Sequence, residues 1–406
     1  MLAQKIDGNL SISFDRLSII TGYSKRHLIR LSDSIKKEGI DSTLKHKNTG
    51  LPAHNRANHS EIDYLIELKK LYPVITIAQF RDIYTEDILE SPIKKNDIDK
   101  YNLKPRSISW FQNLFKQMGW KSPIKHRSHK TNESLHLLRQ RSPREGMLIQ
   151  IDGTPFDWFG NGQVYSLHIA VDDATKKVLA GWFTKNESQL GYCRIMYLII
   201  KKYGIPLSVY SDKHTIFKSP KDDGITQFGM MMEDLGIEMI FANTSQAKGR
   251  VERYNGTAQN RLPNDIIRFG IKDYDELNEW FNEYYVEYLN QKFSYMPLDP
   301  NTEFIPFPPH KDLNMILSLR SEREILNGNM FSYRGYYYIP YDANGEVVKI
   351  RKTTKVKTLE CVLDRKIYIK YFGHTYECQC VEKNQRRNQK VVSNQKELQE
   401  VLNRKK

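Results

Sequence analysis

Three acidic residues follow segments that could bring their side chains together. Asp152 comes directly after the apolar run 148–151, and Asp212 comes directly after the run 207–211, 60 residues later. Both runs predict short strands with an acid near the end. Glu252 lies another 40 residues along the chain. Two acids at strand ends and one on a later segment would form a convergent cluster of carboxylates.

The third acid lies in the stretch 244–257, which predicts the start of a helix. Ser245 can cap the free N–H groups, and Lys248, Glu252 and Asn255 then share one face at i, i+4 and i+7. A carboxylate with a cation one turn before it is unusual on an ordinary surface helix. It suits a group that holds a metal ion while its neighbours hold a phosphate chain.

The sequence around these acids resembles the DDE catalytic core of insertion-sequence transposases and retroviral integrases, and within that family the ISNCY-type bacterial transposases. The resemblance spans about residues 140–300, and it is specific because separate blocks occur in the family's order. The shared blocks are residues 150–159, 172–175, 210–214, 226–229 and 246–257.

The resemblance implies a ribonuclease-H-like core and a metal-dependent reaction at phosphodiesters. Two Mg²⁺ ions, with Mn²⁺ as a substitute, about 3.5–4 Å apart would activate the attacking oxygen and stabilise the leaving oxygen. Hard cations prefer oxygen ligands, and Mg²⁺ keeps several waters, so a few carboxylates suffice. Asp152 would contact both ions, Asp212 one of them and Glu252 the other.

Polar residues next to the acids are candidates for holding DNA near the cut. His214 either contacts the substrate or forms a polar wall of the site. Three further acids, Asp157, Asp172 and Asp173, are interpreted as turn formers or supports, because the resembled motif places its catalytic acids elsewhere. The predicted DNA contacts near the acids are Lys213, His214, Gln246, Lys248 and Arg250.

Composition points to a polyanionic partner. The 406 residues suggest two to four domains, and 62 Lys and Arg against 48 Asp and Glu give a net charge of +14. No apolar stretch reaches the ~18 residues of a membrane span, and the N-terminus lacks a signal-peptide pattern. The four cysteines show no metal-site spacing and are expected to be reduced. We therefore expect a bacterial cytoplasmic, nucleoid-associated protein that binds DNA and no membrane.

The excess positive charge is concentrated in two segments. Residues 121–144 carry seven Lys and Arg against one Glu, and residues 383–406 carry eight against two. Together they hold 12 of the 14 excess charges. A basic linker and a basic tail that contact DNA phosphates are predicted, with solvated segments as the alternative.

Two helical modules are predicted before the core. Residues 1–50 read as a helix-turn-helix, with a turn at Gly22 and a second helix that begins after Ser24. An ordinary helical hairpin with a solvated basic face is the alternative. Residues 51–120 read as a second helical DNA-binding module. The predicted DNA contacts of the two modules are Lys25, Arg26, His27 and Arg30, and Gln112, Asn113 and Lys116.

The remaining chain predicts an α/β core and an all-β module. Between residues 145 and 305, three strand-like runs are followed by alternating helices and strands, which predicts a mixed sheet covered by helices. The predicted strands are 147–151, 164–171, 178–184, 207–211 and 238–241. Residues 320–382 show runs of period two separated by glycines, including a run at 347–351, and predict a small antiparallel β-barrel.

These features predict a DNA transposase that binds the inverted-repeat ends of an element and joins their 3′-hydroxyls to target DNA. Because two ends must be joined in one event, we expect a homodimer or a higher oligomer on double-stranded DNA. Two alternatives stay open at this point. One is a nuclease of the same fold that only hydrolyses DNA, and the other is a DNA-binding regulator with a relic core.

Overall fold

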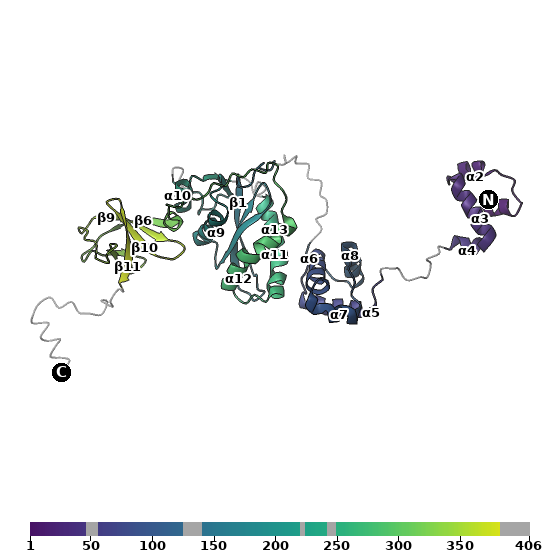
Figure 1. The fold of residues 1–406 in the computed structure, drawn as a ribbon, viewed down its shortest axis with the longest axis horizontal. Helices are drawn as coiled ribbons and strands as arrows, with labels where there is room; N and C mark the ends of the chain where they lie inside the picture. The colour runs from purple at the N-terminus through teal and green to yellow at the C-terminus, as the bar shows by residue number, and fades with distance from the viewer. Residues whose placement is uncertain (46–55, 125–139, 220–223, 242–248, 382–406) are drawn as a thin grey trace, which may run out of the picture. The chain divides into compact units, whose positions relative to one another are not determined.

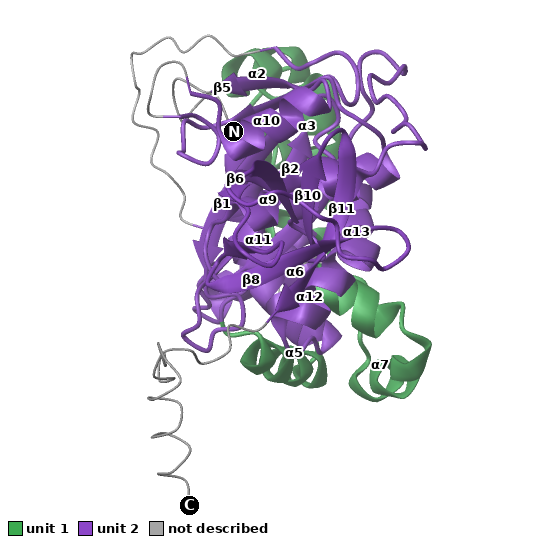
Figure 2. Ribbon diagram, turned by 90° about the vertical axis from the view of Figure 1, so that its left-hand side faces the viewer, with its two compact units in different colours: residues 1–73, 82–107 green, residues 74–81, 108–406 purple. Residues whose placement is uncertain are grey.

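The computed structural model describes residues 1–45, 56–124, 140–219, 224–241 and 249–381. The chain divides into two compact units, coloured green and purple in Figure 2. The first comprises residues 1–73 and 82–107, and the second comprises residues 74–81 and 108–406. The predicted basic tail and residues 125–139 of the predicted linker lie outside the described residues.

The first unit begins with short helices, drawn in purple in Figure 1. Ser13 and Ser24 cap two of them, because each hydroxyl accepts a hydrogen bond from a backbone N–H three residues later. Gly22 ends the first of this pair with φ of 72°, a conformation that glycine adopts without steric cost. The expected pair of helices around a glycine turn is present. The helices are α1 (Leu2–Ile6), α2 (Phe14–Thr21), α3 (Lys25–Glu38) and α4 (Ile40–Leu44).

A buried ion pair holds the rest of the first unit together. Arg106 donates hydrogen bonds of 2.8 and 2.5 Å to the two carboxylate oxygens of Glu61, and the Tyr84 hydroxyl donates to the same carboxylate at 3.2 Å. Such a two-pronged charged contact fixes geometry as well as adding energy. The elements here are α5 (His59–Leu71), the π-helical turn η1 (Tyr84–Leu89), the 3-10 turn η2 (Pro92–Lys94) and α7 (Lys95–Tyr101).

The division between the units falls inside α6 (Ile77–Ile83). In the second unit, Phe80 of α6 makes edge-to-face contacts with Phe111 and Phe115 of α8 (Ile108–Gln117), at centroid distances of 5.8 and 5.5 Å. Trp120 packs on the same ring at 6.0 Å. Residues 74–81 and α8 are therefore joined by an aromatic cluster.

A five-stranded mixed sheet forms the centre of the second unit. Its strand order is β3-β2-β1-β4-β5. β1 and β3 both pair antiparallel with β2, whereas β4 pairs parallel with β1 and with β5. This meander joined to parallel strands is the predicted mixed sheet and has the strand order of the ribonuclease-H-like fold. The strands are β1 (Ile149–Phe156), β2 (Tyr165–Asp172), β3 (Val178–Thr184), β4 (Ser208–Ser211) and β5 (Glu238–Phe241).

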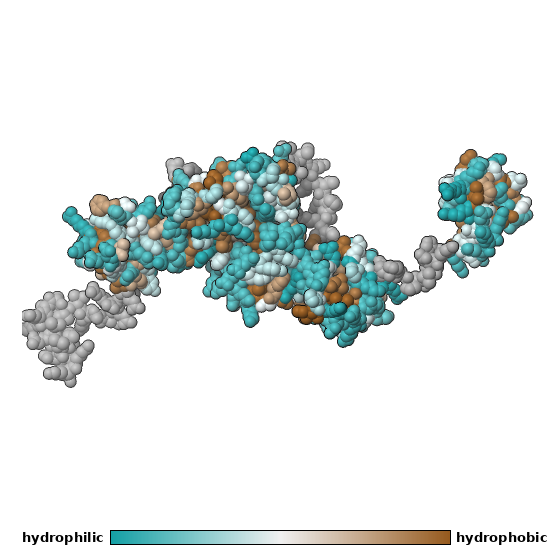
Figure 3. Space-filling view, viewed as in Figure 1, coloured by the Kyte–Doolittle hydropathy of each residue, from teal (hydrophilic) through white to brown (hydrophobic). Residues whose placement is uncertain are grey.

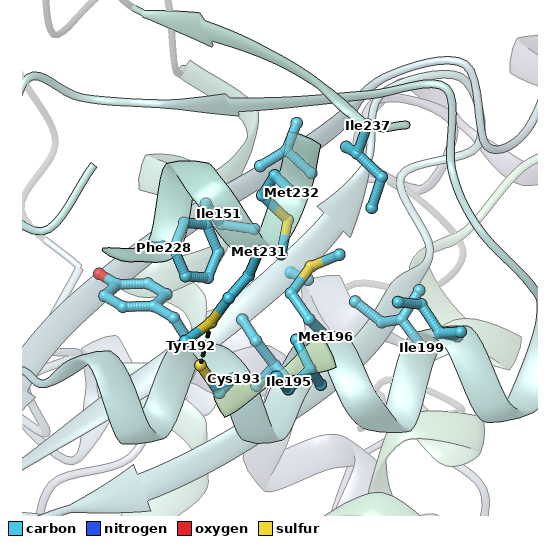
Figure 4. Close-up of a cluster of buried hydrophobic side chains, with 14 of the residues drawn as sticks. Ile151, Tyr192, Cys193, Ile195, Met196, Ile199, Phe228, Met231, Met232 and Ile237 are labelled. Carbon is cyan, nitrogen blue, oxygen red and sulfur yellow. Dashed lines mark hydrogen bonds between the residues drawn. The ribbon is translucent and has the colours of Figure 1, made fainter. Parts of the chain in front are cut away.

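Helices cover both faces of this sheet, and each face has its own apolar cluster (Figure 1). On one face, Ile149 and Ile151 of β1 pack with α9 (Gln189–Lys202) and α10 (Gln227–Asp234). Figure 4 shows this cluster, with the ring of Tyr192 inside it and its hydroxyl at the edge. The other face is covered by α11 (Gly249–Phe269), α12 (Tyr274–Trp280), the π-helical turn η4 (Phe281–Tyr285) and α13 (Val286–Phe293).

The C-terminal part of the second unit is a six-stranded antiparallel sheet with the order β6-β9-β10-β11-β8-β7. Its end strands β6 and β7 contact each other, so the sheet is nearly closed. The predicted strand at 347–351 is wrong, because Val347 forms only an isolated bridge to Tyr341. The short helix α14 (Leu313–Ile316) precedes the strands β6 (Ser318–Glu324), β7 (Phe331–Tyr333), β8 (Tyr336–Tyr341), β9 (Lys355–Cys361), β10 (Ile367–Tyr371) and β11 (His374–Val381).

The face in Figure 3 is mostly hydrophilic, with apolar residues in small patches, as is ordinary for a folded protein. None of the helices in the described ranges combines the length and the apolar character needed to cross a membrane.

A buried histidine links β2, β3 and the start of α9. His168 is fully buried, its Nδ1 lies 3.1 Å from the carbonyl oxygen of Trp182, and its Nε2 accepts a hydrogen bond of 3.0 Å from the Ser188 N–H. These partners require a neutral ring with its proton on Nδ1. Burial lowers the pKa of His168 below its ordinary value.

We predict that His168 makes the fold less stable in mild acid. Since its pKa is lower in the folded state, the unfolded chain binds the proton first as pH falls below about 6.5, and stability is lost there. Urea unfolding at about pH 7.5 and about pH 5.5 should show a smaller free energy of unfolding at the lower pH. His168→Gln should lose part of this pH dependence. Equal pH dependence in both proteins would contradict the assignment.

Candidate active site

The pairing of β1 with β4 aligns the first two predicted acids. Ile149 pairs with Val209 and Gln150 pairs with Tyr210, an offset of 60 residues. Continuing this register by two residues places Asp212 beside Asp152. Adjacent strands lie about 4.8 Å apart, and residues two positions apart point to the same face. This register puts the two carboxylates on one face of the sheet, where β4 ends and β1 continues to Phe156.

A tight turn orients Asp212 where β4 ends. Its Oδ1 accepts a hydrogen bond of 2.9 Å from the backbone N–H of His214. This side chain-to-backbone contact is the Asx turn that short acids form readily. The side chains of Lys213 and His214 are exposed next to it. Both residues predicted to contact DNA here thus face solvent beside the acid.

Helix α11 lies along β1 and matches its spacing. The Val251 N–H donates to Gln150 Oε1 at 3.2 Å, and Asn255 Nδ2 donates to Asp152 Oδ2 at 2.7 Å. One turn further, the side-chain amide of Gln259 donates to the Thr154 hydroxyl at 2.8 Å. Four residues of a helix rise about 6 Å, and two residues of a strand rise about 6.6 Å. Each turn of α11 therefore meets the next residue on the side of β1 that faces it.

Glu252 lies on the first turn of α11 but is exposed. It is three residues before Asn255, so the two side chains leave α11 about 60° apart around the helix. Across the described part of the chain, no three His, Cys, Asp or Glu side chains are grouped closely enough to hold a metal ion. In this conformation the three predicted acids therefore do not form a closed metal-binding group.

A tyrosine and a fourth acid lie close to the aligned pair. The buried Tyr192 donates its hydroxyl proton to Glu187 Oε1 at 2.5 Å. Burial is the main cause that raises the pKa of Tyr192, and the negative charges of Glu187, Asp152 and Asp212 raise this pKa further. A Cβ at Gly153 would come within 2.7 Å of the Glu187 carboxyl carbon and 2.9 Å of the Tyr192 oxygen. The absence of a side chain at position 153 therefore lets these two residues approach the strand.

Asp172, the last residue of β2, and Asp173, which follows it, are buried and bind backbone N–H groups. Asp172 accepts hydrogen bonds from the Gly146 N–H at 2.9 Å and from the Thr175 N–H and hydroxyl at 2.8 and 2.7 Å. Burial raises the pKa of Asp172, and these hydrogen bonds oppose that shift. Asp173 binds the Ser142 N–H at 2.9 Å and pairs with Arg250. Both acids therefore have structural partners.

Several basic residues predicted to contact DNA have partners within the chain. Arg250 is one, and Arg144 of the predicted linker is another, with contacts of 2.6 Å to Asp299 and 2.7 Å to Glu303. Lys25 pairs with Asp15 at 2.8 Å on the surface. Arg26, His27 and Arg30 line a shallow depression along α3, Gln112, Asn113 and Lys116 are exposed on α8, and Gln246 and Lys248 lie outside the described residues.

Sequence reasoning missed the residues that hold the acids. The sequence predicts that Asn255 shares a helix face with Glu252. It gives no sign of the hydrogen bond from Asn255 to Asp152, which lies 103 residues earlier. Gln150, Glu187 and Tyr192 had no signal of their own in the sequence. A polar residue inside an apolar run, as Gln150 is at 148–151, could have served as one, because such a residue is buried and needs a partner.

Comparisons with known proteins agree with the sequence blocks. No protein-family model matches the chain. It is 29% identical over 410 aligned residues to the putative transposase y4bF of Sinorhizobium fredii, covering 99% of this chain and 84% of that protein. It is 36% identical over 228 residues to the transposase for insertion sequence IS1202 of Streptococcus pneumoniae, where the match spans 54% of this chain and 48% of that protein.

Retroviral integrases are among the solved structures with partial similarity to the chain. The catalytic core domain of HTLV-2 integrase matches 35% of this chain and 87% of its own length, at 22% identity and a TM-score of 0.29. The simian T-cell lymphotropic virus intasome matches 70% of this chain and 95% of that chain, at 15% identity and a TM-score of 0.31. The two relatives confirm the resemblance to transposases that the sequence blocks indicate.

Proposed function

We propose that this protein is a DDE transposase that cuts DNA at the ends of an insertion sequence and joins them to target DNA. The observation that carries the proposal is the register of β1 and β4, which aligns Asp152 with Asp212 at the end of β4. The names of the two relatives support the same activity.

The reaction consists of two displacements at phosphorus. In the first, water attacks the phosphodiester at the element end, the bond from phosphorus to the 3′ oxygen breaks, and a 3′-hydroxyl is released. In the second, that hydroxyl attacks a phosphodiester of the target, and a target 3′ oxygen leaves as the new bond forms. No covalent link to the protein is needed, and one set of carboxylates serves both displacements.

The residues at the site suit divalent cations in part. Asp152 and Asp212 supply adjacent oxygen ligands, which hard cations such as Mg²⁺ prefer. Two such ions would neutralise charge on the attacking and leaving oxygens. Asn255 holds one oxygen of Asp152, and the His214 N–H holds one oxygen of Asp212, so both carboxylates are oriented beforehand. Glu252 is exposed on the first turn of α11, and we propose that its side chain turns toward them when the ions bind.

DNA would approach the site from the side where Lys213 and His214 are exposed. Further contacts are proposed for the basic face of α3, for the polar face of α8, and for Gln246 and Lys248. Because two element ends react together, we propose that at least two copies of the chain assemble on DNA.

We predict that Asp152→Asn and Asp212→Asn each abolish Mg²⁺-dependent nicking of element ends while DNA binding persists, because neutral amides are poor ligands for hard cations. Nicking is measured on labelled ends, and binding by gel shift. Asp157→Asn is the matched control, since Asp157 only caps a hairpin through the N–H groups of Asn161 and Gly162. Normal nicking by either site variant would end the assignment.

Pre-nicked ends test the joining step separately. We predict that the wild-type protein joins them to target DNA and that both site variants do not. Hydrolysis without joined products would instead identify a nuclease that carries out only the first displacement.

The basic face of α3 yields another prediction. Arg26→Gln and Arg30→Gln should each weaken binding to element ends and lower the salt slope of binding by about one, because each removes one phosphate contact. Lys36→Gln, an exposed cation at the other end of α3, is the control. Titrations at several salt concentrations measure the slope. Unchanged slopes for both arginine variants would show that α3 has a solvated basic face.

A further inference from the structure

A buried polar network connects the loop after β2 with the first turn of α11. Asp173 is fully buried at its centre, and its Oδ1 accepts a hydrogen bond of 2.6 Å from Gln150 Nε2. Its Oδ2 accepts bonds of 2.9 and 3.1 Å from the N–H and hydroxyl of Ser142. The Arg250 guanidinium forms an ion pair with Asp173 Oδ1.

This network reaches α11 by two routes. One is the Arg250 side chain itself. The other runs through Gln150, whose Nε2 donates to Asp173 while its Oε1 accepts from the Val251 N–H at 3.2 Å. Both routes end within two residues of Glu252, and Gln150 is also two residues before Asp152. The network therefore touches the elements that carry two of the three proposed catalytic acids.

Burial distinguishes Arg250 from the other cation on this turn. The Arg250 side chain is 19% exposed and its acidic partner is fully buried, whereas Arg253 is exposed. Removing one partner of a buried ion pair leaves an uncompensated charge inside the protein, which is strongly unfavourable. Arg250 can leave Asp173 for a DNA phosphate only at that cost.

We propose that Arg250, paired with Asp173, is a positioning residue that, together with the Gln150 contact to the Val251 N–H, fixes the first turn of α11 and thereby the direction of Glu252. It acts through the helix and makes no contact with DNA phosphate. The proposal rests on the proposed function only in treating Glu252 as catalytic. Asp173 and Gln150 are the fixed side of the contact, because the loop after β2 and strand β1 hold them.

The test compares Arg250→Gln, Asp173→Asn, their double variant and Arg250→Lys, with Arg253→Gln as the control for loss of one charge on the same helix. If Arg250 positions the helix, the salt slope of binding to element ends stays at the wild-type value in the Arg250 and Asp173 variants. Nicking at saturating DNA and Mg²⁺ falls by at least about tenfold in both single variants, and the double variant is no worse than either, because the two side chains act as one unit. Arg250→Lys, which keeps the charge, recovers part of the rate.

Hydrogen exchange of the backbone amides at 251–255 provides a readout that needs no activity. We expect faster exchange in Arg250→Gln and Asp173→Asn than in Arg253→Gln, because the first turn of α11 loses its anchor. If Asp173→Asn does not fold, the double variant and Arg250→Lys carry the comparison. A salt slope reduced by about one in Arg250→Gln, together with wild-type exchange, would overturn the proposal and make Arg250 a phosphate ligand.

Failure of the proposed function would look different. A wild-type protein that never nicks its element ends would contradict the transposase assignment, while the exchange rates and salt slopes would still decide the role of Arg250.

Discussion

The parallel pairing of β1 with β4 is the constraint on which the site depends. Side chains alternate along a strand, so a slip of one residue would turn Asp212 to the opposite face from Asp152. The pairing is short, with two partner pairs between these strands, and it is flanked by apolar residues on both faces. The apolar clusters therefore fix the register, and the register fixes the distance between the two carboxylates.

Helix α11 connects the sheet with other elements of the second unit through hydrogen bonds along its length. Near its start it is tied to β1 through Val251, Asn255 and Gln259. Further along, the fully buried Asp265 accepts hydrogen bonds from Gln79 at 3.0 Å and Tyr285 at 2.5 Å. Asn264 adds a bond of 2.9 Å to the Val74 carbonyl. The helix is thus anchored along its length, and residues 74–81 before the core are bound to it.

The sequence predicted the parts of the site that depend on local pattern. Apolar runs followed by acids located β1 and β4. The expectation that Asp152 lies at a strand end is wrong, because β1 continues to Phe156, and it is the register with β4 that aligns Asp152 with Asp212. Contacts between distant segments were beyond such reasoning, because periodicity says which face a residue occupies and not which residue it meets. Arg250 shows the difference: its type and place suggested DNA, whereas its partner is Asp173, 77 residues earlier. The same limit explains the run at 347–351, which has strand periodicity but only an isolated bridge.

The hairpin between β1 and β2 has a consequence for how such chains diverge. Residues 157–164 connect two strands whose pairing is complete without them, and Gly160 and Gly162 lie in this loop without neighbours that a side chain would strike. Insertions among its exposed residues 160–164 would lengthen the chain between Asp152 and Asp212 without disturbing the buried Trp158 or moving either acid. Relatives can therefore differ widely in the number of residues between their acids while preserving the same geometry, and a search that demands fixed spacing would overlook them.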